Sequence, residues 1–200
     1  MKTLLTAAGL AGALVLAPTA NAETWSADPG HTEVLVSWNH AGFSRQSLKF
    51  NAVEGALTFE QGNVEDASAQ FSIIVDSVDT GVPDFDGHLK GEQFLDAANH
   101  PKITFASTEV VQTGDMTVEV TGDLTIKDVT NPATFEITVH SVGEHPVGQF
   151  FDYYKGEWLG MTATTTINRS EWGMDAFIPV GSDELEIVIN TEMKAAGSEG

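Results

Sequence analysis

Apolar and polar residues alternate along much of the chain with the two-residue period of a β-strand. The clearest case is residues 116–126, where apolar side chains or glycine stand at even positions and threonine or acidic side chains at odd positions. Residues 133–140 repeat this pattern closely. Because successive side chains of a strand point to opposite faces, each segment predicts a strand with one face in a core and the other in water.

About eight such strands are expected along the chain. Their segments are 33–38, 48–59, 71–75, 103–105, 116–126, 133–140, 159–167 and 185–189. Helical patterning is confined to a short excursion predicted at residues 86–97, and short connections such as 113–115 favour antiparallel neighbours. A single domain of long antiparallel strands forms either a sandwich or a closed barrel, and the pattern alone leaves both open.

The N-terminal segment 1–22 has the features of a secretory signal peptide. One positive charge precedes an apolar run from Leu4 to Leu16, and the segment ends in Ala20-Asn21-Ala22. We therefore predict cleavage after Ala22, export to the periplasm, a domain over residues 23–194 and a flexible tail at 195–200. The apolar run is shorter than the roughly 20 residues that span a bilayer, so we expect no stable membrane insertion.

Charge and cysteine content narrow the possible partners and compartment. The chain has 29 Asp and Glu against 9 Lys and Arg, a formal net charge of −20. Such a surface repels phosphate backbones and anionic lipid headgroups, so we expect no nucleic-acid partner. An exported chain without cysteine has no disulfide to stabilise it, which favours a bacterial periplasm over an animal extracellular space.

The tripeptide Asp79-Thr80-Gly81 matches the motif of aspartic proteases. Those enzymes need two carboxylates that share a proton, one from each lobe or subunit. The chain has no second copy of the motif. We interpret this tripeptide as the end of a strand.

The nearby residues Asp84, Asp86 and Gly87 resemble the middle of a calcium-binding loop. In that register, Val82 and Gln93 stand where the loop requires an oxygen ligand and a bidentate glutamate. We interpret these carboxylates as turn and helix-start residues.

Other patterns for catalysis or metal binding are weak. The histidines lack the local spacing of a zinc site, although they could converge in space: His31, His40, His88, His100, His140 and His145. The chain has no G-x-S-x-G motif and no cysteine nucleophile, and with 29 acidic residues any carboxylate pair is uninformative about glycoside hydrolysis. We predict no catalytic residue, no metal and no cofactor.

The apolar content allows for a ligand. The chain has 11 Phe and 4 Trp but only 2 Tyr. If the sheet closes into an eight-stranded barrel, its inward apolar face can enclose one small ligand. A filled interior without a cavity is the alternative.

Several short motifs follow one another in a characteristic order. They are Asp28-x-x-His31-Thr32, the segment Val36 to Ser44, Val78-Asp79-Thr80-Gly81, Asp86-x-His88-Leu89-Lys90, Gln93-Phe94-Leu95-Asp96, the segment His100 to Thr108, the segment Gly122 to Pro132, and Ile167 to Met174. In this order and spacing the chain, from about Trp25 to Met193, is similar to the YceI family of bacterial periplasmic proteins. Lys90, His100 and Asp128 stand where that family commonly has Arg, Tyr and Gly.

The resemblance implies a lipocalin-like, extended eight-stranded antiparallel barrel with a long apolar pore. It also implies a binder of polyisoprenoids or related long-chain amphiphilic lipids, with no defining catalytic or metal residues and with a possible homodimer. We predict that residues of the inward phase supply the pore and contact the ligand: Ile73, Val75, Ile103, Phe105, Val118, Val120, Phe135, Ile137, Ile187 and Ile189.

The function expected from these observations is storage or transport of such a lipid in the periplasm. One alternative is an enzyme that acts on the lipid, with polar candidates His31, His40, His88 and Arg169. Another is an interaction protein of an envelope stress or redox system, in which the barrel is merely filled.

Overall fold

Ten β-strands and one short α-helix make up the computed structural model, which describes residues 22–60 and 62–197. The strands are β1 Glu23–His40, β2 Ser44–Phe50, β3 Val53–Glu60, β4 Asn63–Ile74, β5 Val78–Asp79, β6 Lys102–Gly114, β7 Thr117–Ile126, β8 Val129–Glu144, β9 Glu157–Asn168 and β10 Glu184–Ala195. The helix is α1 Pro83–Leu89, and the 3-10 helices are η1 Val75–Ser77, η2 Pro146–Gln149, η3 Asp152–Tyr154 and η4 Arg169–Trp172.

Two segments predicted from the sequence lie largely outside the described residues. The predicted signal peptide at 1–22 lies, apart from Ala22, outside the described residues, and so does the predicted tail beyond residue 197. Within the described ranges, no helix has the length and apolar character needed to cross a membrane.

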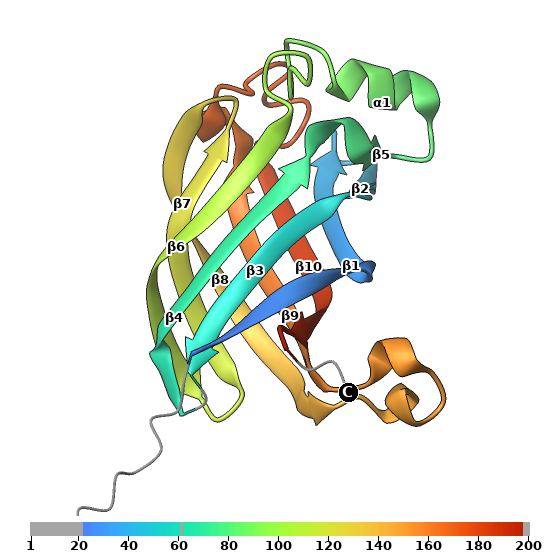
Figure 1. Cartoon of the computed structure of the whole chain (residues 1–200). Helices are drawn as coiled ribbons and strands as arrows, with labels where there is room; N and C mark the ends of the chain where they lie inside the picture. Colours follow the sequence, from blue (N-terminus) through green and yellow to red (C-terminus); the bar gives the residue numbers. More distant parts are fainter. Residues whose placement is uncertain (1–21, 61, 198–200) are drawn as a thin grey trace, which may run out of the picture.

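The strands form one antiparallel sheet that closes on itself (Figure 1). Each long strand pairs with its neighbour in sequence, and β10 closes the ring by pairing with β1, for example Val34 with Ile189. Because the ring of strands is closed, the side chains that point inward from every strand face one shared interior. The structure thus selects the barrel over the sandwich.

Two of the eight barrel strands are interrupted. β1 pairs with β3 over residues 23–26 and with β2 over residues 34–40, so β3 and β2 follow one another along the same side of β1. β5 continues β4 in the same way, because it pairs with β2. The expected eight-stranded antiparallel barrel is confirmed, with its breaks at the ends of β2 and β4.

α1 lies across one end of the barrel (Figure 1). The excursion was expected at residues 86–97, but the helix begins at Pro83 and ends at Leu89, and turns cover the rest. The earlier start is explained by Pro83, whose fixed φ suits the first helical position and whose missing N–H is not needed there. The Asp86 carboxylate accepts hydrogen bonds from the Thr80 N–H, at 2.7 Å, and from the Thr80 hydroxyl, at 2.6 Å. This anchors the helix to the end of β5 and supports a structural interpretation of the acidic residues here.

Glycines on two strands make room for aromatic rings from neighbouring strands. A Cβ on Gly55 would lie 1.9 Å from the Phe71 ring, and one on Gly122 would lie 2.5 Å from the Phe105 ring and 2.4 Å from the Ala106 carbonyl oxygen. Because such distances are impossible for real atoms, these glycines fix where the two phenylalanine rings lie.

β10 ends one residue beyond the predicted domain end at 194. Ala195 is buried and pairs with Trp25 of β1. The small residues from 195 onward predict a tail, but Ala195, the first of them, completes the last strand.

Candidate functional site

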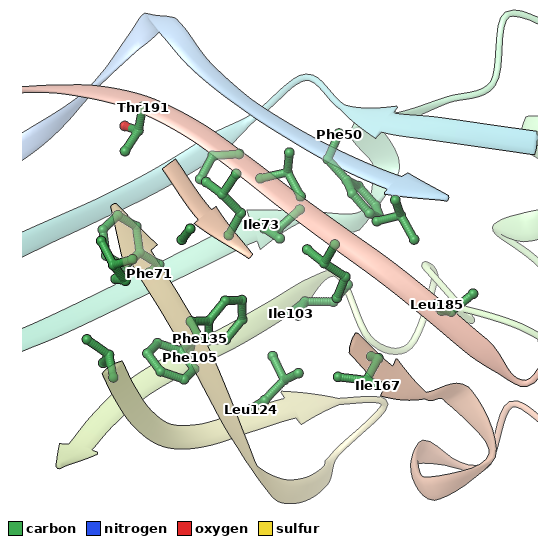
Figure 2. Close-up of a pocket in the computed structure, with 18 of the residues that line it drawn as sticks. Phe50, Phe71, Ile73, Ile103, Phe105, Leu124, Phe135, Ile167, Leu185 and Thr191 are labelled. Carbon is green, nitrogen blue, oxygen red and sulfur yellow. The ribbon is translucent and has the colours of Figure 1, made fainter. Parts of the chain in front are cut away.

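The barrel encloses a cavity of about 780 Å³. This volume lies in the usual range for small-molecule sites. Apolar side chains from the long strands line it, and Figure 2 shows Phe71, Ile103 and Phe135 directed into it. A closed ring of strands with an apolar inner face therefore contains space, and the filled barrel is not what the structure shows.

Nine of the ten predicted pore residues line this cavity. They are Ile73, Ile103, Phe105, Val118, Val120, Phe135, Ile137, Ile187 and Ile189. All nine lie on strands with clear two-residue alternation, so their direction follows from the period of the strand.

Val75 is the exception. β4 ends at Ile74, and Val75 opens the 3-10 helix η1, with its N–H bonded to the Pro101 carbonyl oxygen at 3.0 Å. Its side chain is 1% exposed and packs in the core rather than on the cavity wall. The alternation of Phe71 and Ile73 predicts that Val75 also points inward, but the strand ends before this residue, at the break between β4 and β5.

Further lining residues were missed in the sequence. They include Val34, Val36, Leu48, Phe50, Phe71, Leu124, Ile167 and Leu185. Phe71, Leu124 and Leu185 are in phase with predicted neighbours, so the same alternation could have found them. The lining residues Phe85 and Phe177 lie outside the strands, and no periodic signal marks them.

The cavity extends along the barrel. At the α1 end it is lined by Trp38, Phe85 and Phe94, and at the opposite end by Gly62 and Met116, which lie beside hairpin turns. Figure 1 places α1 and those turns at opposite ends of the molecule. The space is therefore elongated, as a chain-like ligand requires.

Aromatic rings cluster at the α1 end, which we call the mouth. His88 lies 5.2 Å from Phe94 and 6.2 Å from Phe177 between ring centroids, and Phe94 and Phe177 stack at an interplanar angle of 18°. Phe177 and Val180 line the cavity and are 61% and 68% exposed. The mouth thus combines a wall of ring faces with an apolar rim open to solvent.

Arg169, a candidate of the enzyme alternative, is buried beside the mouth. Its guanidinium donates hydrogen bonds to the carbonyl oxygens of Ser182, Met174 and Ala176. Burial lowers the pKa of this group, while the neighbouring carboxylates act in the opposite direction. The side chain is committed to holding the loop between η4 and β10, which leaves it poorly placed to act on a ligand.

His31 lies outside the cavity, in a polar cluster with Asp28. His31 Nδ1 is 2.5 Å from Asp28 Oδ2, and the Tyr153 hydroxyl donates to Asp28 Oδ1 at 2.7 Å. Burial raises the pKa of Asp28, but hydrogen bonds from His31, Tyr153 and the Gly30 N–H outweigh it and lower the pKa overall. The hydrogen bond to Asp28 raises the pKa of His31, and it raises that of Tyr153 to about 12.

Glu192 brings a third potential ligand atom to this cluster. Atoms of Asp28, His31 and Glu192 lie within 4.8 Å of one another, close enough for a metal ion. Both Asp28 oxygens already accept hydrogen bonds, so we interpret the cluster as a structural link between β1 and the segment that contains η3.

His40 and His88 are the remaining polar candidates of the enzyme alternative. Both line the cavity at its mouth.

Comparisons with known proteins agree with this geometry. A family model described as the YceI-like domain matches residues 25–193. A UPF0312 protein of Pseudomonas putida (strain W619) is 32% identical over 176 residues, which cover 87% of this chain and 88% of that protein. One of Shewanella denitrificans is 33% identical over 187 residues, with 91% and 94% covered.

Solved structures share the fold at lower identity. Burkholderia cenocepacia BcnA matches with a TM-score of 0.73 and 22% identity, covering 83% of this chain and 98% of that one. A structure described as a polyisoprenoid binding domain from Saccharophagus degradans, implicated in plant cell wall breakdown, matches with a TM-score of 0.61 and 15% identity, covering 86% and 98%.

Proposed function

The chain belongs to the YceI-like family, and from that premise we propose that it holds a polyisoprenoid or similar long-chain amphiphilic lipid in its barrel, for storage or transport in the periplasm. The observation that carries the proposal is the elongated cavity of about 780 Å³ with its apolar wall. The description of the Saccharophagus degradans neighbour as a polyisoprenoid binding domain supports the ligand class.

Hydrophobic burial supplies enough free energy for such a ligand. At about 0.8 kcal/mol per buried methylene-sized group, one five-carbon isoprene unit contributes up to about 4 kcal/mol before ordering costs. Micromolar affinity requires about 8 kcal/mol, so a few units suffice.

The barrel also limits how much of a chain it can cover. A ten-residue strand such as β7 spans about 33 Å. Tilted by about 40°, it reaches about 25 Å along the barrel axis. A chain of many isoprene units would therefore bend or protrude from an end.

The arrangement of polar groups supports binding rather than catalysis. Arg169 is held by backbone carbonyls, and His31 is bonded to Asp28 away from the cavity. His40 and His88 reach the mouth, and the ring partners of His88 are aromatic side chains.

Mass spectrometry of the purified mature protein after organic extraction tests this proposal. We expect about one long-chain lipid per protein, or uptake of one added polyisoprenoid per protein if the extract is empty. Conversion of added lipid into a product would favour the enzyme alternative. An empty protein that takes up no lipid would contradict the proposal.

A further inference from the structure

The lysine and arginine side chains are engaged in contacts within the protein, which leaves few of them available to a charged ligand. Apart from Lys2, which lies outside the described residues, each of them contacts an oxygen atom of the protein. Those in ion pairs with carboxylates are Arg45 with Glu186, Lys49 with Asp79, Lys90 with Asp76, Lys102 with Glu54, and Lys155 with Asp152. The others donate to backbone carbonyls: Lys127 to Glu92, Lys194 to Tyr153, and Arg169 to the loop beside the mouth.

The cavity wall itself has few ionisable side chains. Among the described residues that line it, these are Asp115 at the hairpin end and His40, His88 and Arg169 at the mouth. Arg169 has its guanidinium bonded to carbonyl oxygens, and a histidine is not a permanent cation. Neither end of the cavity therefore offers the free, fixed positive charges with which proteins usually bind phosphate.

Acidic side chains also lie at this end of the barrel. Asp84 and Asp86 lie in the first turn of α1, and Asp175 and Asp183 act electrostatically on Arg169. They belong to a chain with a formal net charge of −20. An anionic group that enters here loses hydration, and Arg169, the one permanent cation among the described lining residues, is already bonded to carbonyl oxygens and has two carboxylates near it. The negative charge of the whole chain adds a repulsive potential.

We infer that the ligand has an uncharged polar end, and that the barrel binds a polyisoprenoid alcohol in preference to the phosphate or diphosphate ester of the same chain. The inference rests on the proposed function, because it assigns the end group of a polyisoprenoid whose apolar part lies in the cavity. The apolar wall contributes equally to both ligands, so the charges at the two ends decide between them.

Farnesol and farnesyl diphosphate test this directly, since they share one chain of three isoprene units. Their dissociation constants are measured on the delipidated mature protein at low and high salt. We expect farnesol to bind at least about tenfold more tightly at low salt, because protein surfaces carry potentials of several kT. The ratio should shrink towards 0.5 M salt, which screens the repulsion.

Each outcome of that comparison is informative. Equal or tighter binding of the diphosphate at low salt overturns the inference and leaves the proposed function standing. Binding of neither compound overturns the proposed function, and the inference with it.

A pair of rim variants isolates the role of charge. Val180 lines the cavity and is mostly exposed, so its replacement should not disturb folding. We expect Val180→Lys to bind farnesyl diphosphate severalfold more tightly than Val180→Gln, with farnesol affinity the same in both. Equal diphosphate affinity in the two variants would show that charge at the mouth does not set the preference.

Discussion

Ile137 allows a direct test of whether the cavity binds the ligand. It lines the cavity from β8 and pairs with Val118 of β7 and Ala163 of β9. We expect Ile137→Asp to weaken lipid binding about a hundredfold or more, because a ligand chain would bury an unpaired carboxylate at a cost of several kcal/mol. The measurement is a lipid-binding titration on protein shown to be folded by circular dichroism.

Thr138→Asp is the matched control, since Thr138 is exposed on the opposite face of the same strand. It adds the same charge and should leave lipid affinity within a factor of about two, because exposed charges are screened. Unchanged binding in a folded Ile137→Asp variant would contradict the assignment of the cavity as the ligand site.

Gly122 tests how closely the cavity wall is packed. Because an added Cβ would collide with Ala106 and Phe105, we expect Gly122→Ala to lower the free energy of unfolding by about 1–3 kcal/mol. Gly160→Ala on β9 is the control, since an added Cβ there meets no atom within 4 Å. Denaturant unfolding distinguishes the two, and equal stabilities would refute the close contact between β6 and β7.

The pair formed by His31 and Asp28 predicts a pH dependence of stability. The folded protein holds the His31 proton more tightly than the unfolded chain, whose ordinary pKa is 6.5. This contribution is fully present below pH 6.5 and is lost as pH rises through the raised pKa. Asp28 has a lowered pKa, so its contribution is present above the ordinary value of 3.8 and is lost at lower pH.

We therefore expect the melting temperature to fall as pH rises from about 6.5, and this fall to be smaller in His31→Gln. Thermal unfolding followed by circular dichroism across that range measures both. An identical pH profile in the variant would show that the His31–Asp28 contact does not stabilise the fold.

Among the elements, α1 is placed to control access to the cavity. Phe85, His88 and Leu89 line the cavity from this helix, and Asp86 anchors it to Thr80. We expect Asp86→Ala to weaken the anchor by about 1–3 kcal/mol, the usual cost of losing hydrogen bonds to a charged group. Hydrogen exchange of residues 80–97 should speed up, and bound lipid should dissociate faster.

Asp84→Ala is the control within the same helical turn, because the Asp84 carboxylate does not bond to Thr80. It should leave both rates close to those of the unaltered protein. Faster exchange without faster lipid release in Asp86→Ala would mean that α1 covers the mouth without gating it.

The strands also show where the two-residue alternation is enough to predict which side chains point into the barrel. β7 alternates along its length and β8 does so over residues 133–139, and the predicted inward residues Val120 and Phe135 line the cavity. Val75 was misplaced because a two-residue period carries no sign of where a strand breaks. The carbonyl cage around Arg169 was invisible for a related reason, since its partners are backbone atoms of a loop.

At the scale of the whole molecule, the pattern predicted one apolar face but left sandwich and barrel open. The pairing of β1 with β10 settles that question, and it joins the two ends of the domain rather than neighbours in sequence. Alternation also does not report volume, because the same inward residues could fill a barrel or line a cavity. Phe105 and Phe135, whose ring centroids lie 5.1 Å apart, both line the cavity of about 780 Å³ that the structure contains.

The central claim is that a long apolar chain lies inside the barrel. A crystal structure of the mature protein with a bound polyisoprenoid alcohol tests it most directly. The account predicts continuous ligand density along the cavity, past Phe105 and Phe135, with the polar end at an opening. Ligand density confined to the outer surface, with the cavity collapsed around its own side chains, would contradict it.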